Sequence, residues 1–431
     1  MPTQRDHRLP LAPDWQYQVS VDKSGSIDTT PLFTTTCSAD LARNNTWMLA
    51  VRYKASSRWK VPAVTVGCDG TDLFTQYFEP GEAGRRLINL TGIHSLANLK
   101  LTLQHMSVEH DADLLGFQRP DVGTGPMLII APHPDDAELA AFGLYRKYPE
   151  NTWIVTLTAG ERLKRLDKQY WPELDDSIGE AAKRKGFIRA WNSATTPLLA
   201  GVPANQLIML GYFNDTLAAL QDSPDIDVPS YAATQMTPDT YRRWNKVALP
   251  SDGKALNTGQ HLQQDLAALL DQIKPATIIT PHPEVDPHPD HIASTRHLVA
   301  ALHQSGHIPV SILLYANHLK STRGFPRGPV HAAAGVWPLD ITDSAFGDWK
   351  LASFPLSLEG QKQKALALHS MHDLGGSPGL ERRLKRRLLR RLGGIPMHQW
   401  KEYGAHDFFQ THIKAHENYI AVTASTLLTY T

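Results

Sequence analysis

The sequence has little cysteine, no long apolar run and no excess of either charge. Its two cysteines, Cys37 and Cys68, are too few for a disulfide framework and lack CxxC spacing, so we expect reduced structural thiols. No stretch approaches the roughly 18 apolar residues of a membrane span, and the first residues have no signal-peptide core. We therefore expect neither a transmembrane helix nor a signal peptide. The expected location is the cytoplasm.

The overall charge excludes a globally basic protein. Lys and Arg total 43, as do Asp and Glu, so the net charge is zero and no nucleic-acid partner is expected. Any electrostatic partner site must therefore be local. Hydrophobic residues make up 42% and charged residues 20%, as in ordinary globular proteins, and 431 residues favour two domains.

Two kinds of pattern follow one another along the chain. Up to about residue 118, short β-rich runs such as TWMLAVRY and LKLTLQHMSV alternate with Ser, Gly, Asp and Asn clusters, which is typical of a β-sandwich. From residue 127, strand patterns such as MLIIA and ATIIT alternate with helical ones, which predicts a Rossmann-like α/β fold, a mostly parallel sheet flanked by helices. We expect a β-sandwich over residues 1–120 and the α/β domain, with a C-terminal helical extension, over 121–431.

Histidines and acids follow two of the expected strands. In LIIAPHPDDAELAAFG, residues 128–143, an apolar run breaks into His133, Asp135 and Asp136. In ATIITPHPEVDPHPDHIAS, residues 276–294, Asp290 and His291 open a second helix. Ligands bind at the carboxyl ends of parallel strands, and such residues can supply three ligands to Zn²⁺ while water takes the fourth position.

The adjacent carboxylates Asp135 and Asp136 repel each other and are costly to bury unless a cation neutralises one of them. The other acid is then free to take a proton from water. Taken alone, His-Pro-Asp-Asp also fits a turn and helix N-cap, but the second strand end favours a metal site. His282 and Asp286 compete as ligands or shape the loop.

The motifs PHPDDAE and HPDH together resemble those of the PIG-L (LmbE-like) N-acetylglucosamine deacetylase family. The resemblance implies that His133, Asp136 and His291 are the metal ligands. It implies that Asp135 is the general base. It further implies Zn²⁺ as the cofactor, with Fe²⁺ or Co²⁺ as alternatives that suit the same N and O ligands.

The same resemblance assigns the remaining site residues. His288 would support the oxyanion and protonate the leaving amine, with Asp290 orienting it. Arg184 and Asp215 would bind substrate, although Phe187 stands where the family normally has a Glu after this Arg.

The activity that the resemblance implies is removal of an N-acetyl group from an amino sugar in a glycoconjugate, such as a lipopolysaccharide core or a lipid-linked sugar. Within the enzyme class, a thiol-conjugate amidase of the same family would use identical metal chemistry. From another class, the chain could be a catalytically silent glycan-binding or assembly protein. A base beside a metal argues against this last interpretation, because a binding protein has no need of one.

Two further features have alternative interpretations. The aromatic residues Trp15, Trp47, Tyr53 and Trp59 of the N-terminal part could stack on sugar rings or pack in a core. Residues 381–392 hold seven Arg or Lys residues against one acid, with Leu at every fourth position, which predicts a basic amphipathic helix. Its leucines either pack on the domain, or the helix docks on anionic phosphate, at the inner face of the membrane or on a phosphorylated glycolipid.

Overall fold

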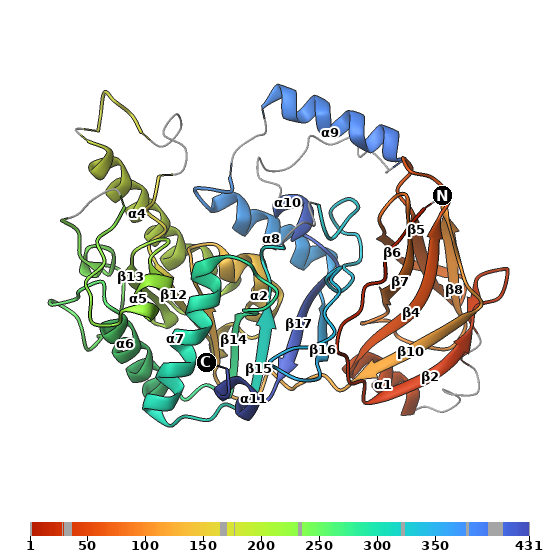
Figure 1. Ribbon diagram of the computed structural model, residues 1–431, viewed down its shortest axis with the longest axis horizontal. Helices are drawn as coiled ribbons and strands as arrows, with labels where there is room; N and C mark the ends of the chain where they lie inside the picture. Colours follow the sequence, from red (N-terminus) through yellow and green to blue (C-terminus); the bar gives the residue numbers. More distant parts are fainter. Residues whose placement is uncertain are drawn as a thin grey trace. The chain divides into compact units, whose positions relative to one another are not determined.

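The computed structural model describes residues 2–27, 29, 37–163, 170–175, 177–231, 235–319, 324–375, 379–394 and 408–430. The chain divides into two compact units, whose elements Figure 1 labels. The N-terminal unit comprises Met1–Pro120, Ser321–Ala365 and Gly376–Ile420, and the α/β unit comprises Asp121–Lys320, Leu366–Gly375 and Ala421–Thr431. The first division between the two units falls between Pro120 and Asp121. Most residues after 320, however, group with the N-terminal residues, whereas the sequence predicted that they belong to the α/β domain.

The N-terminal unit contains two largely antiparallel sheets. The first has the order β1-β7-β4-β10-β2, with β9 also on β4, and the second has the order β3-β8-β5-β6. Among the described strand pairings of these two sheets, only the short pairing of β1 with β7 is parallel. The bounds are β1 Thr3–Gln4, β2 Trp15–Ser20, β3 Ser26–Ile27, β4 Thr46–Ala55, β5 Ala63–Cys68, β6 Thr71–Tyr77, β7 Glu82–Asn89, β8 Leu99–Gln104, β9 Met106–Val108 and β10 Asp111–Phe117, and the helix α1 spans Cys37–Asn44.

Residues from both sheets share one buried core. In β8, Leu99 and Leu101 are buried whereas Lys100 is exposed, because successive side chains of a strand point to opposite faces. They join Leu49 of β4 and Val64 of β5 in the same apolar cluster. Cys68 is a buried free thiol, as expected, whereas the Cys37 side chain lies outside the described part.

The core also accounts for most of the aromatic residues that could have stacked on sugars. Trp47 and Tyr53 are buried, and Trp15 packs against Trp47 with ring centroids 5.9 Å apart. Trp59 differs, because 78% of its surface is exposed. Three of the four therefore belong to the core.

A buried asparagine joins the C-terminal segments to the N-terminal strands. Asn89 Nδ2 donates to the carbonyl oxygen of Ala334 and to Ser353 Oγ, each at 2.9 Å, and Asn89 Oδ1 accepts from the Thr91 backbone at 2.9 Å. These bonds help to explain why most residues after 320 group with the N-terminal unit. The elements of this C-terminal part are β16 Lys350–Pro355, α8 Leu358–Ser370, α9 Leu380–Gly393, α10 Phe408–Thr411 and β17 His416–Val422.

The α/β unit has the parallel sheet and covering helices that the sequence predicted (Figure 1). Its strands lie in the order β13-β12-β11-β14-β15, and every neighbouring pair is parallel. The strands are β11 Met127–Ala131, β12 Thr152–Thr158, β13 Leu207–Tyr212, β14 Thr277–Pro281 and β15 Ser311–Tyr315. The α-helices are α2 Asp136–Lys147, α4 Ile178–Thr195, α5 Leu217–Asp222, α6 Gly259–Ile273, α7 Pro289–Ser305 and α11 Ala424–Leu428.

The strand order reverses beside β11. Strands β12 and β13 follow on one side of β11, whereas β14 and β15 lie on the other. Such a reversal leaves a crevice at the carboxyl ends of the two central strands, where α/β proteins bind their ligands. The His133 motif follows β11 and the His288 motif follows β14, so the topology brings both motifs to this crevice.

The asparagine in the N-terminal unit gives a test of the fold. We expect Asn89→Ala to lower the free energy of unfolding by about 2–3 kcal/mol, because the buried groups that it bonds lose their partner. The exposed β2 residue Gln18 is the control, and Gln18→Ala should change stability by less than about 0.5 kcal/mol. Urea unfolding followed by tryptophan fluorescence measures both, and equal effects would contradict the role of Asn89.

Candidate metal and catalytic site

The turn between β11 and α2 is strained at Asp135. This residue has a φ of 129°, outside the regions that non-glycine residues normally adopt, which costs on the order of 1–3 kcal/mol. Asp135 is the N-cap of α2, but its side chain makes no capping hydrogen bond. The side chain is therefore not placed there to cap the helix, which removes the simplest structural explanation for this acid.

Three ligand atoms converge next to this turn. His133 Nδ1 lies 3.3 Å from Asp136 Oδ2, His291 Nε2 lies 3.2 Å from the same oxygen, and the two ring nitrogens are 3.3 Å apart. All three residues are buried. Zn²⁺ bonds of about 2.0–2.1 Å in a tetrahedral site would separate ligand atoms by about 3.3 Å. The three residues therefore fit a divalent metal in both chemistry and spacing.

Each of the three residues has a buried partner on its other side. Asp290 Oδ2 lies 3.0 Å from His133 Nε2, and Asp286 Oδ2 lies 2.9 Å from His291 Nδ1. Such outer carboxylates fix the tautomer and orientation of metal-binding histidines. The third partner is an amide, because Asn317 Nδ2 donates to Asp136 Oδ1 at 2.8 Å.

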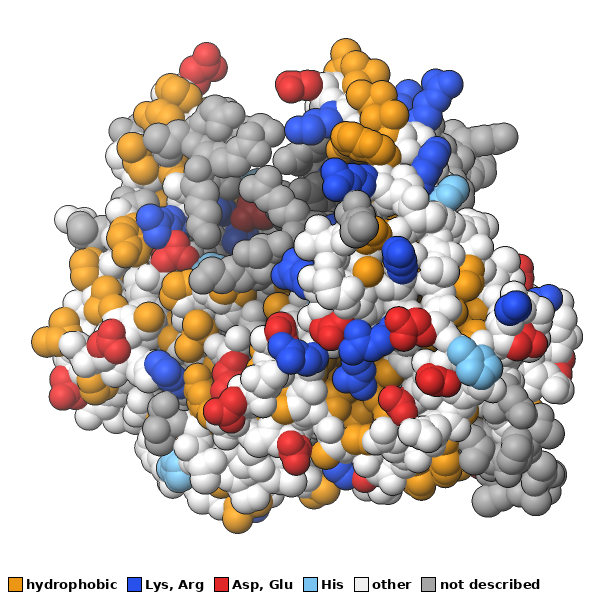
Figure 2. All heavy atoms as spheres, turned by 45° about the vertical axis from the view of Figure 1, so that its right-hand side comes forward, with side chains coloured by type: hydrophobic (Ala, Val, Ile, Leu, Met, Phe, Trp, Pro, Cys, Tyr) orange, Lys and Arg blue, Asp and Glu red, His pale blue; other side chains and the backbone are white. Residues whose placement is uncertain are grey.

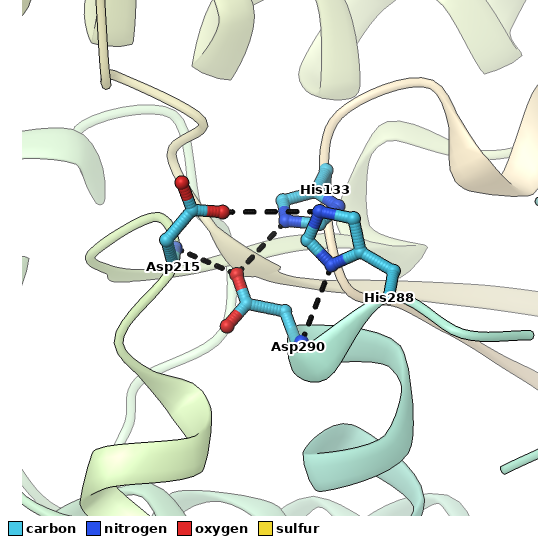
Figure 3. Close-up of side chains that lie close together, drawn as sticks. All are labelled: His133, Asp215, His288 and Asp290. Carbon is cyan, nitrogen blue, oxygen red and sulfur yellow. Dashed lines mark hydrogen bonds and ion pairs between the residues drawn. The ribbon is translucent and has the colours of Figure 1, made fainter.

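Asp290 has a different partner from the one expected. Its carboxylate does not orient His288, because Oδ2 bonds His133 and also accepts from the Asp215 backbone at 2.7 Å, and Oδ1 accepts from the Leu217 backbone at 3.1 Å. His288 instead bonds the backbone of Asp290, whose N–H donates to His288 Nδ1 at 3.2 Å (Figure 3). Asp290 therefore orients a metal-ligand candidate.

The expected substrate residue Asp215 lies beside His288. Its Oδ1 is 3.8 Å from His288 Nε2 (Figure 3), and its Oδ2 is 2.6 Å from Arg162 Nη1. Ligand atoms of His133, Asp215, His288 and Asp290 also lie close enough together to hold a metal. Because backbone N–H groups already bond both Asp290 oxygens, we interpret this second group as a hydrogen-bond network.

Arg189 lies beside the candidate base, whereas Arg184, which is expected to bind substrate, has other partners. Arg184 instead pairs with Asp175, and its guanidinium lies 4.4 Å from the Trp171 ring centroid. Arg189 Nη2 is 3.1 Å from Asp135 Oδ2, and Arg189 Nη1 is 2.9 Å from Asp373 Oδ2. Arg189 therefore links the candidate base to an acid near the end of the chain.

The protonation of the site follows from its burial. Burial raises the pKa of Asp135 to about 7, against the opposing effect of Arg189. Burial also opposes ionisation of Asp136, yet the adjacent His291 and His133 hold the pKa of Asp136 well below its usual value. The two neighbouring acids are thus distinct: Asp136 is the permanent anion, and Asp135 is the group that can exchange a proton near neutral pH.

The sequence motifs did not identify the residues that surround the metal-ligand candidates and Asp135. Asn317 follows β15, the neighbour of β14, so a polar residue at this third strand end was a usable signal. Asp286 was considered as a ligand or loop residue, and the structure places it behind His291. Arg189 and Asp373 had no such signal, because their pairing depends on contacts between distant parts of the chain.

The outer carboxylates give a metal-binding test. We expect one divalent metal per chain, and Asp286→Ala should weaken its affinity about 10–100-fold because His291 loses its orienting partner. Asp175→Asn is the control, since it alters another buried acid that pairs with Arg184. Zn²⁺ titration with a competing chelator measures the affinity. Metal retained in His291→Ala but lost in His282→Ala would contradict the ligand assignment.

Comparison with known proteins finds one family model that matches part of the chain. Residues 128–302 match the model of the PIG-L family, described as GlcNAc-PI de-N-acetylase. The matched residues include all eight that the sequence motifs had assigned to the site, which are His133, Asp135, Asp136, Arg184, Asp215, His288, Asp290 and His291. No curated protein is significantly similar to the chain.

Several solved structures are weakly similar. The conserved protein TT1542 from Thermus thermophilus is 20% identical, with 63% of this chain and 91% of that chain covered and a TM-score of 0.30. A deacetylase from the teicoplanin biosynthesis pathway is 16% identical, with 69% and 98% covered and a TM-score of 0.35. GalB, the 4-carboxy-2-hydroxymuconate hydratase from Pseudomonas putida KT2440, is 13% identical, with 65% and 94% covered and a TM-score of 0.32.

The family match does not depend on these weak structural similarities. It confirms the resemblance that the two histidine motifs had suggested, and it spans both strand ends that form the site. Residues 128–302 therefore resemble the PIG-L, GlcNAc-PI de-N-acetylase, family.

Proposed function

We propose that the α/β unit is a metal-dependent hydrolase that removes the N-acetyl group of an amino sugar. The proposal depends on the position of the Asp135 carboxylate. It makes no capping hydrogen bond, and Asp135 precedes Asp136, a member of the cluster that could hold a metal. A purely structural acid would gain nothing from a strained backbone and a largely buried position. The family match supports the de-N-acetylase class.

His133, Asp136 and His291 are the residues that would hold the metal. Zn²⁺ suits two imidazoles and a carboxylate, and Fe²⁺ or Co²⁺ are alternatives. When bound, such an ion polarises an amide carbonyl and lowers the pKa of water, the two requirements for hydrolysing an acetamide. Asp290 and Asp286 hold the rings of His133 and His291 in the orientation that this binding needs.

Asp135 would act as the general base. Arg189, at 3.1 Å, fixes its carboxylate, and only 13% of the Asp135 side chain is exposed. Asp135 takes the proton of the attacking water as the C–O bond forms, and the departing nitrogen must then gain a proton as the C–N bond breaks. Once Asp135 has taken that proton from water, it is a source for the nitrogen alongside the expected donor His288.

His288 would stabilise the oxyanion by donating a hydrogen bond. Its Nδ1 accepts from the Asp290 backbone, so the neutral ring carries its proton on Nε2. Burial, together with the nearby His133 and His291, lowers the pKa of His288 to about 4. The neutral donor therefore predominates at neutral pH, and a hydrogen bond, not a full charge, is what it offers the oxyanion.

The surroundings of Asp215 suit a sugar. Arg162 pairs with Asp215, and its guanidinium lies 4.1 Å from the ring centroid of Tyr231, which is 66% exposed. Charged hydrogen-bonding groups beside an exposed aromatic ring match the hydroxyls and the apolar face of a pyranose. We propose an N-acetylhexosamine in a glycoconjugate, such as a lipopolysaccharide core or a lipid-linked sugar, as the substrate.

The N-terminal unit adds less to the proposal. Its two sheets with a shared core support the β-sandwich interpretation of residues 1–120. With Trp47 and Tyr53 in that core, however, the aromatic residues give little support to glycan binding by this unit.

Acetate release tests the activity. Metal-loaded protein should release acetate from N-acetylhexosamine glycoconjugates, and Asp135→Asn should slow this release about 10²–10⁴-fold, the usual contribution of a positioned base. Metal content should remain unchanged in the variant, which separates loss of the base from loss of the site.

Other products would identify the alternative functions. Cleavage of a thiol-conjugate amide without acetate release would indicate the amidase of the same family. Tight glycan binding with no product, in protein of full metal content, would indicate the silent binding protein.

A second prediction concerns His288. We expect His288→Ala to bind metal normally but to lose roughly 10²–10³-fold in kcat, because the oxyanion loses a donor. His288→Gln should recover part of this loss, since its amide N–H can still donate. Loss of metal from the Ala variant would instead make His288 a ligand together with Asp215 and Asp290.

A further inference from the structure

The helix α9 presents its apolar side to solvent. Its leucines are exposed over more than half of their surface: Leu380 70%, Leu384 56%, Leu388 58%, Leu389 59% and Leu392 52%. The half-buried positions are instead basic, namely Arg383, Arg386 and Arg390. A surface helix of a globular domain normally turns its apolar stripe inward. The leucines therefore do not pack on the domain, which was one of the two expected alternatives.

Basic side chains border the exposed leucines. Figure 2 shows hydrophobic side chains gathered on the surface of α9, with Lys and Arg side chains beside them. Lys385, Arg387 and Arg391 are all exposed. Glu381 is the only acid between residues 381 and 392. An apolar stripe with cationic borders is complementary to a surface whose interior is apolar and whose outer layer is anionic.

The carboxyl end of α9 lies beside an exposed tryptophan of the same unit. Val61 donates its backbone N–H to the Gly393 carbonyl at 2.8 Å, and Arg390 donates to Gln410 of α10. These bonds attach α9 to the N-terminal unit. Trp59, two residues before Val61, is 78% exposed. Tryptophan side chains of this kind favour the boundary between water and lipid.

The charge of α9 argues against a second copy of the chain as the occupant. Pairing two such helices through their leucines would bring seven cations per helix close together, with one acid each to offset them. An anionic surface removes this repulsion. The helix is 14 residues long, about 21 Å, which is too short to cross a bilayer but suits a helix lying in its surface.

We propose that α9 and Trp59 form a docking surface for an anionic lipid bilayer. The leucines of α9 enter the boundary between headgroups and acyl chains, and the flanking Lys and Arg side chains bind lipid phosphates. No helix in the described part of the chain is long and apolar enough to span a membrane. This inference is independent of the hydrolase activity, because all of its residues lie in the N-terminal unit.

Vesicle co-sedimentation tests the proposal on the full chain. The protein should sediment with vesicles of equimolar phosphatidylglycerol and phosphatidylcholine, sediment less at high salt, and stay in solution with pure phosphatidylcholine. Replacing Lys385, Arg387 and Arg391 by Gln should weaken binding roughly 10²-fold in total, about fivefold for each lost charge. Replacing Leu384, Leu388 and Leu392 by Gln should weaken it at least about tenfold.

Matched variants control for the number and kind of substitutions. The control for the basic set changes three exposed lysines outside α9 to Gln: Lys23, Lys100 and Lys246. The control for the leucine set changes three exposed apolar residues outside α9 to Gln: Ile226, Ile308 and Val310, which are exposed by 61%, 70% and 82%. Gln favours helix, so α9 should persist, and circular dichroism checks this. Both controls should bind as the wild type does.

The outcomes separate insertion from simple attraction. Absence of sedimentation with anionic vesicles, or equal binding by all variants, overturns the proposal. Loss of binding in the basic set alone also overturns it, because the leucines would then not enter the lipid. Dimers in light scattering that the leucine set abolishes, without vesicle binding, would assign the stripe to a second copy.

Trp59 supplies an independent readout. Anionic vesicles should shift the tryptophan emission of the wild type to shorter wavelength, and Trp59→Phe should remove most of this shift while binding persists. An unchanged shift in Trp59→Phe would exclude Trp59 from the docking surface.

Discussion

The pairing of buried histidines with buried carboxylates is the constraint on which the site depends. His133 and His291 each contact Asp136 on one side and a second acid, Asp290 or Asp286, on the other. Unpaired charges at this depth would cost several kcal/mol each. The pairs can form only because β11 and β14 are neighbours, so that two motifs distant in sequence meet at one edge of the sheet.

This constraint also explains the contrast between Asp135 and Asp136. Asp136 lies among histidines and a donating asparagine, so its negative charge is matched on every side. Asp135 has Arg189 as its partner, and Arg189 is shared with Asp373. The chain adopts an unfavourable φ at Asp135, where the carboxylate makes no capping hydrogen bond with the helix and pairs with Arg189.

The sequence was informative where the determinants were local. The alternation of strands and helices predicted the parallel sheet. The two histidine motifs predicted which residues meet, because a residue that directly follows a parallel strand lies at the carboxyl edge of the sheet, independently of the other elements. The partner of Asp290 was predicted wrongly for a physical reason. Proximity in HPDH suggested His288, but an acid in the first turn of α7 faces the crevice, where His133 and the backbone of Asp215 compete for it. Other features could not be predicted because they depend on distant partners: Asp373 reaches Arg189 across 184 residues of chain, and Asn89 bonds Ala334 across 245.

The orientation of α9 is an intermediate case. The spacing of its leucines and arginines predicted an amphipathic helix, but periodicity alone does not say which face turns inward. An arginine can be half-buried at little cost, since its aliphatic stem packs while its guanidinium finds an acceptor, as Arg390 does with Gln410. A leucine has no equivalent means of making its exposure favourable in water. The inward basic face is therefore tolerable in solution, whereas the outward leucine face is favourable only when an apolar phase covers it.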